Sequence, residues 1–352
     1  MRVSQLMFLH LLKGKKGDTS DFTPTQLAGL YTNSALLVTI MDFLKDELWL
    51  KKQEDKRNGQ KTSYKDFISP LFEDELEAVS FLREFLVESG AEKIKEIKKR
   101  SKSIEAHVIE SIIDKRGHEQ KEFLIQSLNT MSTHFIKEEK DQEGRIQQMG
   151  HQGPNLYRTF DNLDDIFELN YQLDQEMTYD STTKERLYQR AGVGVQSGYS
   201  TILLALEGID ASAGDTVVDL GSGYGRVGLV CSLLRPDLEF VGYEYVDHRV
   251  EVSNNACQNL GLDESLTFKV QDLSLKSFSI PKADIYYLYD PFSKETYDYV
   301  LNQILEISYE KKITIVTKGN ANKWLMDIAQ EQQWPSPIII DEGNLCIFTN
   351  RY

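Results

Sequence analysis

The chain has 352 residues, enough for two domains of ordinary size, and its 40% hydrophobic and 27% charged residues describe a globular protein rather than a disordered one. Its formal net charge is −15, and nucleic-acid binding usually needs a basic surface. A DNA or RNA partner is therefore disfavoured, although a local basic groove stays open as an alternative. An acidic protein suits a cationic partner instead, such as a lysine- or arginine-bearing protein segment.

The cysteine and histidine positions indicate neither a disulfide framework nor a metal site. Cys231, Cys257 and Cys346 are far apart, and the six histidines are scattered without metal-ligand spacing. Reduced thiols of this kind favour a cytoplasmic protein, and the N-terminus lacks a signal-peptide pattern. Polar residues interrupt the apolar stretch at 27–50, which therefore predicts a buried helix rather than a membrane span.

The first 150 residues read as an α-helical domain, whose role we expect to be the selection of a substrate or partner. Apolar residues recur there at steps of three and four, which predicts helices over 65–138. The predicted apolar stripes are Phe72, Leu76, Val79, Leu82 and Leu86, then Ile94, Ile97, Ile104, Val108 and Ile112, then Leu124, Leu128, Met131 and Phe135. Such stripes bury against one another, so a helical bundle or long hairpin is expected. Residues 151–196 are predicted to be a connecting segment that can also cover an active site.

Residues 197–352 alternate short apolar strands with amphipathic helices, the pattern of an α/β domain with a mostly parallel sheet. Seven strands are expected at 216–220, 238–245, 266–272, 283–290, 312–319, 337–342 and 344–350. The last two leave no room for a helix between them, so they form a hairpin and one of them runs antiparallel. The prediction is a Rossmann-like seven-stranded sheet with a terminal antiparallel strand, preceded by the helical domain.

The segment "VVDLGSGYGRVG" at 217–228 contains two overlapping glycine patterns. Gly221, Gly223 and Gly225 give G-x-G-x-G, while Gly223, Gly225 and Gly228 give G-x-G-x-x-G. A strand, a glycine turn and a helix N-terminus together indicate a nucleotide site. The dinucleotide pattern expects its first glycine directly after the strand, but counting from Gly221 places Arg226 where the third glycine belongs.

Three acids end three predicted strands, and they favour S-adenosylmethionine (SAM) over NAD(P). Asp219 faces the glycine turn, where it would repel a pyrophosphate and attract the ammonium of a methionine group. Glu244 can accept both ribose hydroxyls, and Asp272 can accept from the adenine amine. Together they describe a cationic nucleoside without phosphate.

At these residues the sequence resembles the class I, seven-strand SAM-dependent methyltransferases over about 195–352. The resemblance implies their fold and assigns cofactor contacts to Asp219, Gly221, Ser222, Gly223, Gly225, Glu244 and Asp272, with Tyr245 and Gln271 beside the two later acids. The alternative for each acid is that it has no binding role and only faces solvent at the end of its strand.

The segment "YDPF" at 289–292 resembles a shortened form of the (Asp/Asn)-Pro-Pro-(Tyr/Phe) motif of amino-group methyltransferases. The resemblance implies that Asp290 accepts the N–H bonds of an amine and aims its lone pair, with Tyr289 assisting and Phe292 packing the substrate stem. A simple strand-ending turn is the alternative.

The segment "GVGVQSGYSTILLAL" at 192–206 is similar to the loop that folds over SAM in the non-SET histone lysine methyltransferases. Gly194, Gln196 and Ser197 take the covering positions. Val195 stands where that family has Glu, and Asp290 where it has Asn, which leaves the lysine target open. A glycine-rich turn before an amphipathic helix accounts for the segment equally well.

The hypothesis is a SAM-dependent N-methyltransferase acting on an amine, most readily a protein lysine side chain. A small-molecule amine is the alternative acceptor. Two further classes stay open: an NAD(P)-dependent oxidoreductase, and a non-catalytic interaction protein that keeps a SAM-binding domain.

Overall fold

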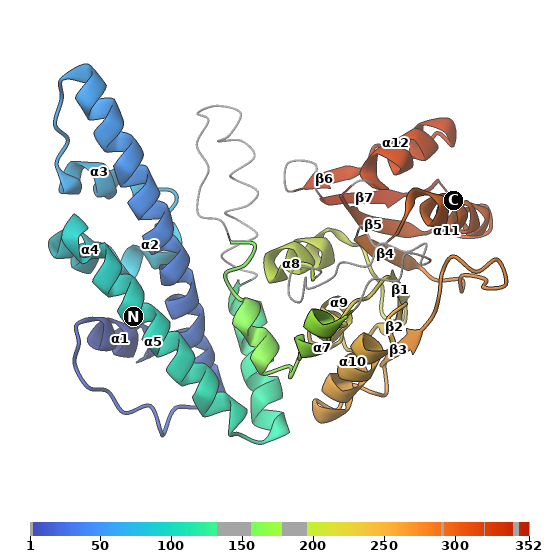
Figure 1. Cartoon of the computed structure of the whole chain (residues 1–352), viewed down its shortest axis with the longest axis horizontal. Helices are drawn as coiled ribbons and strands as arrows, with labels where there is room; N and C mark the ends of the chain where they lie inside the picture. The colour runs from blue at the N-terminus through green and yellow to red at the C-terminus, as the bar shows by residue number, and fades with distance from the viewer. Residues whose placement is uncertain are drawn as a thin grey trace. The chain divides into compact units, whose positions relative to one another are not determined.

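The chain forms two compact units, Met1–Ile166 and Phe167–Tyr352, in a computed structural model that describes residues 3–131, 156–177, 196–289, 292–319, 321–340 and 345–351 (Figure 1). The boundary between the units lies inside 151–196, the segment predicted as a connection. Each unit has buried apolar side chains of its own.

The first unit is helical in its described residues. Its helices are α1 (Val3–Leu12), α2 (Pro24–Asn58), α3 (Tyr64–Leu71), α4 (Arg83–Ser89), α5 (Ile94–Ile113) and a helix over 117–131, with 3-10 turns at Glu77–Leu82 (η1), Ala91–Lys93 (η2) and Asp161–Asp165 (η3). The sequence sets both ends of α2. Thr23 and Gln26 form a capping box around Pro24, and Gly59 closes the helix in the left-handed conformation.

Helix α2 contains the apolar stretch that the sequence predicts to be buried. By length and composition it could cross a membrane, since one window has a mean hydropathy of 1.4, but 72% of that window is buried inside the protein. It packs against α5, where Ser101 Oγ donates a hydrogen bond of 2.9 Å to the carbonyl of Ser34. A long apolar helix covered in this way has the environment of a core helix.

The three predicted apolar stripes are buried, but one of them is not carried by a single helix. Residues Phe72 to Leu86 pass through a turn, η1 and α4, because α3 ends at Leu71, with Pro70 in its last turn, and Val79 has non-helical backbone angles. Their side chains still point inward, and Leu76, Val79 and Leu82 are fully buried. The other two stripes lie on helices as predicted, up to Met131; Phe135 falls outside the described residues.

The second unit has the predicted seven-stranded sheet. Its strands are β1 (Thr216–Leu220), β2 (Glu239–Glu244), β3 (Leu266–Val270), β4 (Ile285–Tyr289), β5 (Thr314–Lys318), β6 (Ile338–Ile340) and β7 (Leu345–Thr349). The strand order is β3-β2-β1-β4-β5-β7-β6 (Figure 1). Strands β1 to β5 pair in parallel, and β7 runs antiparallel to both β5 and β6. The terminal hairpin and its antiparallel strand are therefore confirmed.

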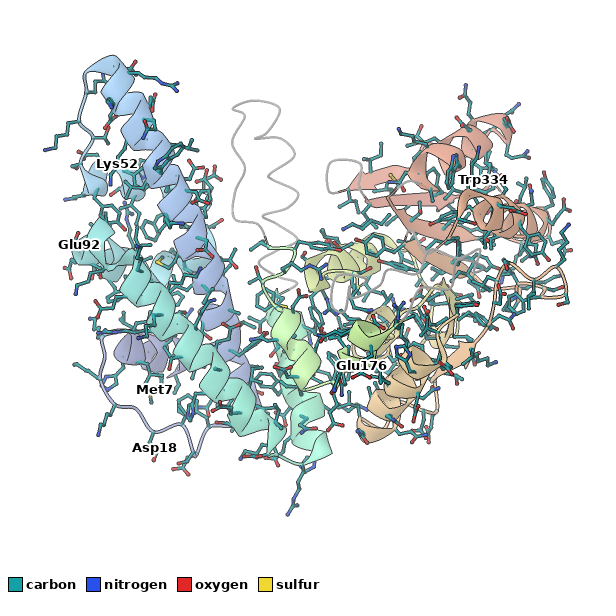
Figure 2. All side chains as sticks on the ribbon, in the orientation of Figure 1. Met7, Asp18, Lys52, Glu92, Glu176 and Trp334 are labelled. Carbon is teal, nitrogen blue, oxygen red and sulfur yellow. The ribbon has the colours of Figure 1, made fainter. Side chains whose placement is uncertain are left out.

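Helices pack on both faces of this sheet. They are α7 (Gln172–Glu176), α8 (Tyr199–Gly208), α9 (Arg226–Leu234), α10 (Asp247–Asn259), α11 (Lys294–Ser308) and α12 (Ala321–Glu331). On one face, Val218 of β1 and Tyr286 of β4 share a core with α11, α12 and Trp334, a residue labelled in Figure 2. Because side chains alternate along a strand, Val217, Asp219 and Tyr287 lie on the other face, with α8 and α9.

Candidate active site

The turn between β1 and α9 is the glycine turn that the sequence singles out. Gly221, Gly223 and Gly225 have φ values of 92°, 56° and 77°, a left-handed backbone that other residues adopt only with strain. The amides of Gly221 and Ser222 donate to the carbonyl of Tyr243 on β2, at 2.8 and 2.9 Å. The turn is thereby fixed to the carboxyl end of the neighbouring strand, and it leads directly into the first turn of α9.

Two of these glycines also have close neighbours at the position that a Cβ atom would take. A Cβ on Gly225 would lie 2.6 Å from the ring of Phe268, and a Cβ on Gly223 would lie 2.8 Å from Gln196 Nε2. Larger residues at either position would meet these side chains. Packing inside the protein, as well as backbone conformation, therefore favours glycine at both positions.

Asp219 lies beneath this turn, 2% exposed, near the end of β1. Its Oδ2 atom is buried and has no hydrogen-bond partner among the described residues. Burial raises the pKa of this carboxyl well above its ordinary value, and the charge of Glu244 raises it further. An unpartnered buried carboxylate next to another carboxylate is costly, and a cationic ligand would relieve that cost.

Glu244 ends β2, 6% exposed, and its carboxylate holds the glycine turn from the other side. Oε2 accepts from the amide of Gly223 at 2.9 Å, and Oε1 accepts from the amide of Val246 at 3.0 Å. The structure thus brings the two predicted acids, Asp219 and Glu244, together around the glycine turn.

The predicted adenine contacts follow Glu244 and the end of β3. The side chain of Tyr245 is 36% exposed, and the amide of Gln271 donates to the carbonyl of Glu244 at 2.8 Å. Asp272 Oδ1 accepts from both the amide and the hydroxyl of Ser274 at 2.9 and 2.6 Å. These three residues border the same strand ends, and Asp272 is held by its own turn.

Gln196 and Ser197 lie directly before α8 and are both 3% exposed. Ser197 Oγ is 2.9 Å from the hydroxyl of Tyr287, the residue of β4 that pairs with Asp219. Arg226 Nη1 donates to the carbonyl of Ser197 at 2.9 Å, and its guanidinium lies 4.6 Å from the centre of the Tyr199 ring. The start of α8 is therefore joined to the glycine turn and to β4. Gly194 and Val195 fall outside the described residues.

The predicted acceptor residues are only partly described. Tyr289 ends β4 and is half-buried, while Asp290 and Pro291 lie outside the described residues. Phe292 is 4% exposed, and its ring centre is 5.1 Å from that of Tyr297 in the core under α11. This differs from the expectation that Phe292 packs a substrate, because the apolar core takes up its ring.

Lys318 is a residue that the sequence reasoning missed. It ends β5 beside Tyr289, is 2% exposed, and places its Nζ 5.4 Å from the centre of the Tyr289 ring. The same Nζ donates to Thr201 Oγ1 on α8 at 3.0 Å. A lysine at the end of a strand made of Thr, Ile and Val was the signal available in the sequence. Lysine is almost never fully buried without a reason.

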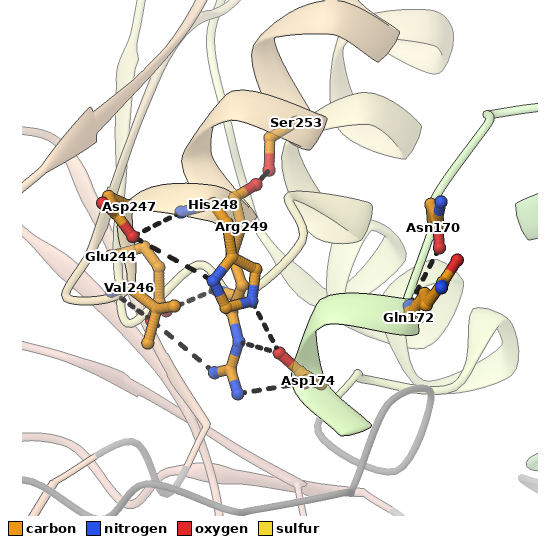
Figure 3. Close-up of polar contacts among 10 residues, drawn as sticks. Asn170, Gln172, Asp174, Glu244, Val246, Asp247, His248, Arg249 and Ser253 are labelled. Atoms are coloured by element: carbon orange, nitrogen blue, oxygen red, sulfur yellow. Dashed lines mark hydrogen bonds and ion pairs between the residues drawn. The ribbon is translucent and has the colours of Figure 1, made fainter. Parts of the chain in front are cut away.

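A second missed group surrounds Arg249, near the start of α10 (Figure 3). Its guanidinium binds Asp174 of α7 through two hydrogen bonds of 3.1 Å. It also lies 3.6 Å from Glu244 Oε1. Burial lowers the pKa of Arg249, but the charges of Glu244 and Asp174 outweigh burial and raise it. Nothing in the polar segment around Asp174 marks it in the sequence.

The second unit has the fold of the class I methyltransferases: strand order 3-2-1-4-5-7-6, an antiparallel seventh strand and helices on both faces. In open α/β sheets of this kind, ligands bind beyond the carboxyl ends of the strands. The glycine turn, Glu244, Tyr289 and Lys318 all lie at that edge.

No family model and no curated protein matches the chain. Among solved structures it is similar to TrmN of Thermus thermophilus, with 17% identity, a TM-score of 0.35, and 43% of this chain matched to 49% of that one. An RNA methyltransferase of Salinibacter ruber, solved with S-adenosyl-L-homocysteine, is 19% identical over 44% of this chain and 92% of its own, with a TM-score of 0.33. A precorrin-6y C5,15-methyltransferase of Geobacter metallireducens is 11% identical over 51% of this chain and 95% of its own, with a TM-score of 0.35. At this low identity, the activities and substrates of those proteins are not transferred to this chain.

Proposed function

We propose that the unit Phe167–Tyr352 binds SAM and transfers its methyl group to an amine nitrogen, with a protein lysine side chain as the first acceptor to test. The observation that carries the proposal is the buried, unpartnered carboxylate oxygen of Asp219 beside a left-handed glycine turn. A pyrophosphate at this turn would meet Asp219 and Glu244 and be repelled. A methionine ammonium would instead neutralise the charge of Asp219.

The remaining residues of the strand edge fit the rest of SAM. Glu244 accepts two backbone amides, one on each oxygen, and retains lone pairs for the ribose hydroxyls. The exposed ring of Tyr245 offers a face for adenine. When bound, SAM supplies an electrophilic methyl group on a positively charged sulfur. The acceptor nitrogen forms the new N–C bond as the C–S bond breaks, and it then loses a proton.

The acceptor site is proposed at the end of β4. A lysine amine attacks only in its neutral form, so its proton must leave before methyl transfer. Lys318 borders this site, because its buried Nζ lies beside the Tyr289 ring at the end of β4. We assign to Asp290 the role of accepting the amine N–H bonds, from the motif alone.

The test is calorimetry of the full chain with SAM and with NAD⁺, followed by transfer of a labelled methyl group into protein, RNA and small-amine fractions of a cell extract. We expect SAM binding, no NAD⁺ binding and label in protein. Asp219→Ala should lose SAM affinity. Asp290→Ala should keep SAM affinity and lose transfer.

Each other outcome would assign a different function to this protein. NAD⁺ binding without SAM binding indicates an oxidoreductase, and SAM binding without any transfer indicates a non-catalytic interaction protein. Label in small amines or in RNA replaces the lysine target with that acceptor. A cytoplasmic location also remains a proposal, which cell fractionation tests.

A further inference from the structure

Asp174 is a fully buried carboxylate outside the residues assigned to SAM (Figure 3). It belongs to α7, a short helix well before the sheet in sequence. Oδ1 and Oδ2 accept from Nε and Nη2 of Arg249, each at 3.1 Å, and His248 Nε2 lies 2.9 Å from Oδ1. A paired fork of this kind fixes the plane of the guanidinium.

The third guanidinium nitrogen of Arg249, which does not bind Asp174, lies near a second carboxylate, that of Glu244. Nη1 lies 3.6 Å from Glu244 Oε1, which is beyond hydrogen-bond distance but within the range of an ion pair. Arg249 and Glu244 are 5% and 6% exposed. The guanidinium thus bridges two buried carboxylates and binds only one of them with full hydrogen bonds.

The lone pairs of Glu244 show why this difference matters. A carboxylate has about four acceptor positions, and the amides of Gly223 and Val246 use two of them. About two remain, the number that the two ribose hydroxyls of SAM require. If Arg249 turned its fork onto Glu244, it would occupy those two positions.

We propose that Asp174 is a positioning residue for the cofactor site: it holds the Arg249 fork away from Glu244, so that Glu244 keeps acceptor positions for the ribose hydroxyls. This inference rests on the proposed SAM function. Asp174 acts through Arg249 and Glu244 and does not itself touch the cofactor. It places the segment before the sheet among the determinants of cofactor binding.

A neighbouring contact on the same segment supports the assignment. The Tyr171 ring meets the Tyr224 ring edge-on, with 4.6 Å between ring centres, and Tyr224 belongs to the glycine turn. The Arg249 guanidinium lies 5.7 Å from the centre of the same Tyr224 ring. Residues 171–174 therefore contact both the glycine turn and Arg249, the residue that lies beside Glu244.

The test measures binding of S-adenosylhomocysteine and of its 2′,3′-dideoxy analogue to the full chain by calorimetry. Asp174→Asn should weaken the natural ligand by about tenfold, the loss expected for one charge-assisted hydrogen bond, and should leave the dideoxy analogue unchanged. The matched control is Glu168→Gln. Glu168 Oε2 accepts from Asn259 Nδ2 of α10 at 2.8 Å, so it joins the same segment to the same helix without reaching Glu244.

Three results decide the inference. Equal effects of Asp174→Asn and Glu168→Gln, or equal losses for both ligands, overturn it, because both point to a merely structural role. In the double variant Asp174→Asn with Glu244→Gln, we expect no greater loss than with Glu244→Gln alone; additive losses overturn the route through Glu244. If wild-type protein binds neither ligand, the proposed function itself fails.

A second variant covers the case in which Asp174→Asn does not fold. Arg249→Lys keeps the charge but lacks the fork, so a single ammonium must choose between the two carboxylates. We expect the same selective loss for the ribose-bearing ligand. An unchanged preference between the two ligands overturns the proposal.

Discussion

Asp219 places cofactor binding and stability of the ligand-free protein in opposition. Its carboxylate is 2% exposed, and one oxygen has no hydrogen-bond partner among the described residues. We expect Asp219→Asn to raise the free energy of unfolding of the ligand-free protein by about 1–2 kcal/mol, because it removes a buried charge. The same change should weaken SAM by about tenfold or more, because the ammonium loses its counter-charge.

Thermal unfolding and calorimetry check the two effects on the same sample. Leu220→Ala, in the adjacent position of β1, has its side chain on the other face of the sheet and provides the control for packing alone. An Asn variant that binds SAM as tightly as the wild type would contradict the role assigned to Asp219.

The pH dependence of stability follows from the same carboxyl. Burial and the charge of Glu244 raise its pKa in the folded protein above the ordinary value of about 3.9. Below that ordinary pKa the group is protonated in both the folded and unfolded states. As pH rises through the folded pKa, the unfolded state gains the advantage and this contribution to stability is lost.

We therefore expect the stability gap between Asp219→Asn and wild type to be near zero at about pH 4 and to widen as pH rises. As pH rises, the stability of the wild type should fall while its affinity for SAM increases, because the ionised carboxylate binds the ammonium. Melting curves of both proteins across this pH range measure the gap. A gap independent of pH would show that Asp219 ionises alike in both states.

At the residue scale, local sequence patterns predicted three features that lie close together in the structure, and their role in binding stays a prediction. The glycine turn, Asp219 and Glu244 follow from strand ends and spacing, and the structure brings them together. Asp174, Arg249 and Lys318 could not be predicted in this way. Each is an ordinary charged residue in the sequence, and only tertiary burial makes it unusual.

At the scale of elements, the turn between β1 and α9 depends on glycine for two separable reasons. Gly225 has a left-handed φ of 77°, and a Cβ there would also meet the Phe268 ring at 2.6 Å. Gly214 has a φ of 85°, with nothing within 4 Å of its Cβ position. The pair therefore separates backbone strain from collision.

We expect Gly214→Ala to lower the free energy of unfolding by about 1 kcal/mol through strain alone, and Gly225→Ala to lower it by about 3 kcal/mol through strain and overpacking. Denaturant unfolding of both variants measures the difference. Gly225→Ala should also weaken SAM, since the loop must move away from Phe268, whereas Gly214→Ala should not. Equal losses of stability would show that the ring of Phe268 yields freely.

Element types were predictable wherever one period dominated. Alternation of short apolar strands with helices predicted all seven strands, and Arg226–Leu234 was predicted at both ends because the glycine turn and Pro236 bound it. The stretch from Phe72 to Leu86 shows the limit. Its spacing identified buried side chains correctly, but the proline and the 3-10 turns decided the backbone. The spacing of buried residues predicts one continuous helix only when no helix-breaking residue lies within the segment.

For the whole molecule, charge is the property that bears on the acceptor. The net charge is −15, and residues 200–352 carry 22 Asp and Glu against 12 Lys and Arg. A field of this sign attracts cations over distances up to the Debye length, about 10 Å at 0.1 M salt. If the acceptor is a basic protein segment, this field would speed its encounter with the protein without changing the chemistry at the strand edge.

Because long-range charge affects encounter and not the chemistry at the site, we can predict how salt acts on methyl transfer if the acceptor is a protein lysine. Raising ionic strength from about 50 to about 300 mM should lower kcat/KM for a lysine peptide with basic flanking residues by about three- to tenfold, because screening slows encounter. The kcat should stay unchanged, because the site itself is buried and weakly screened. A peptide of the same length with neutral flanks is the control and should show little change. Equal salt dependence of the two peptides would mean that the acidic charge does not steer the acceptor. An RNA acceptor whose kcat/KM exceeds that of both peptides at the same ionic strength would move the proposed target from protein to nucleic acid.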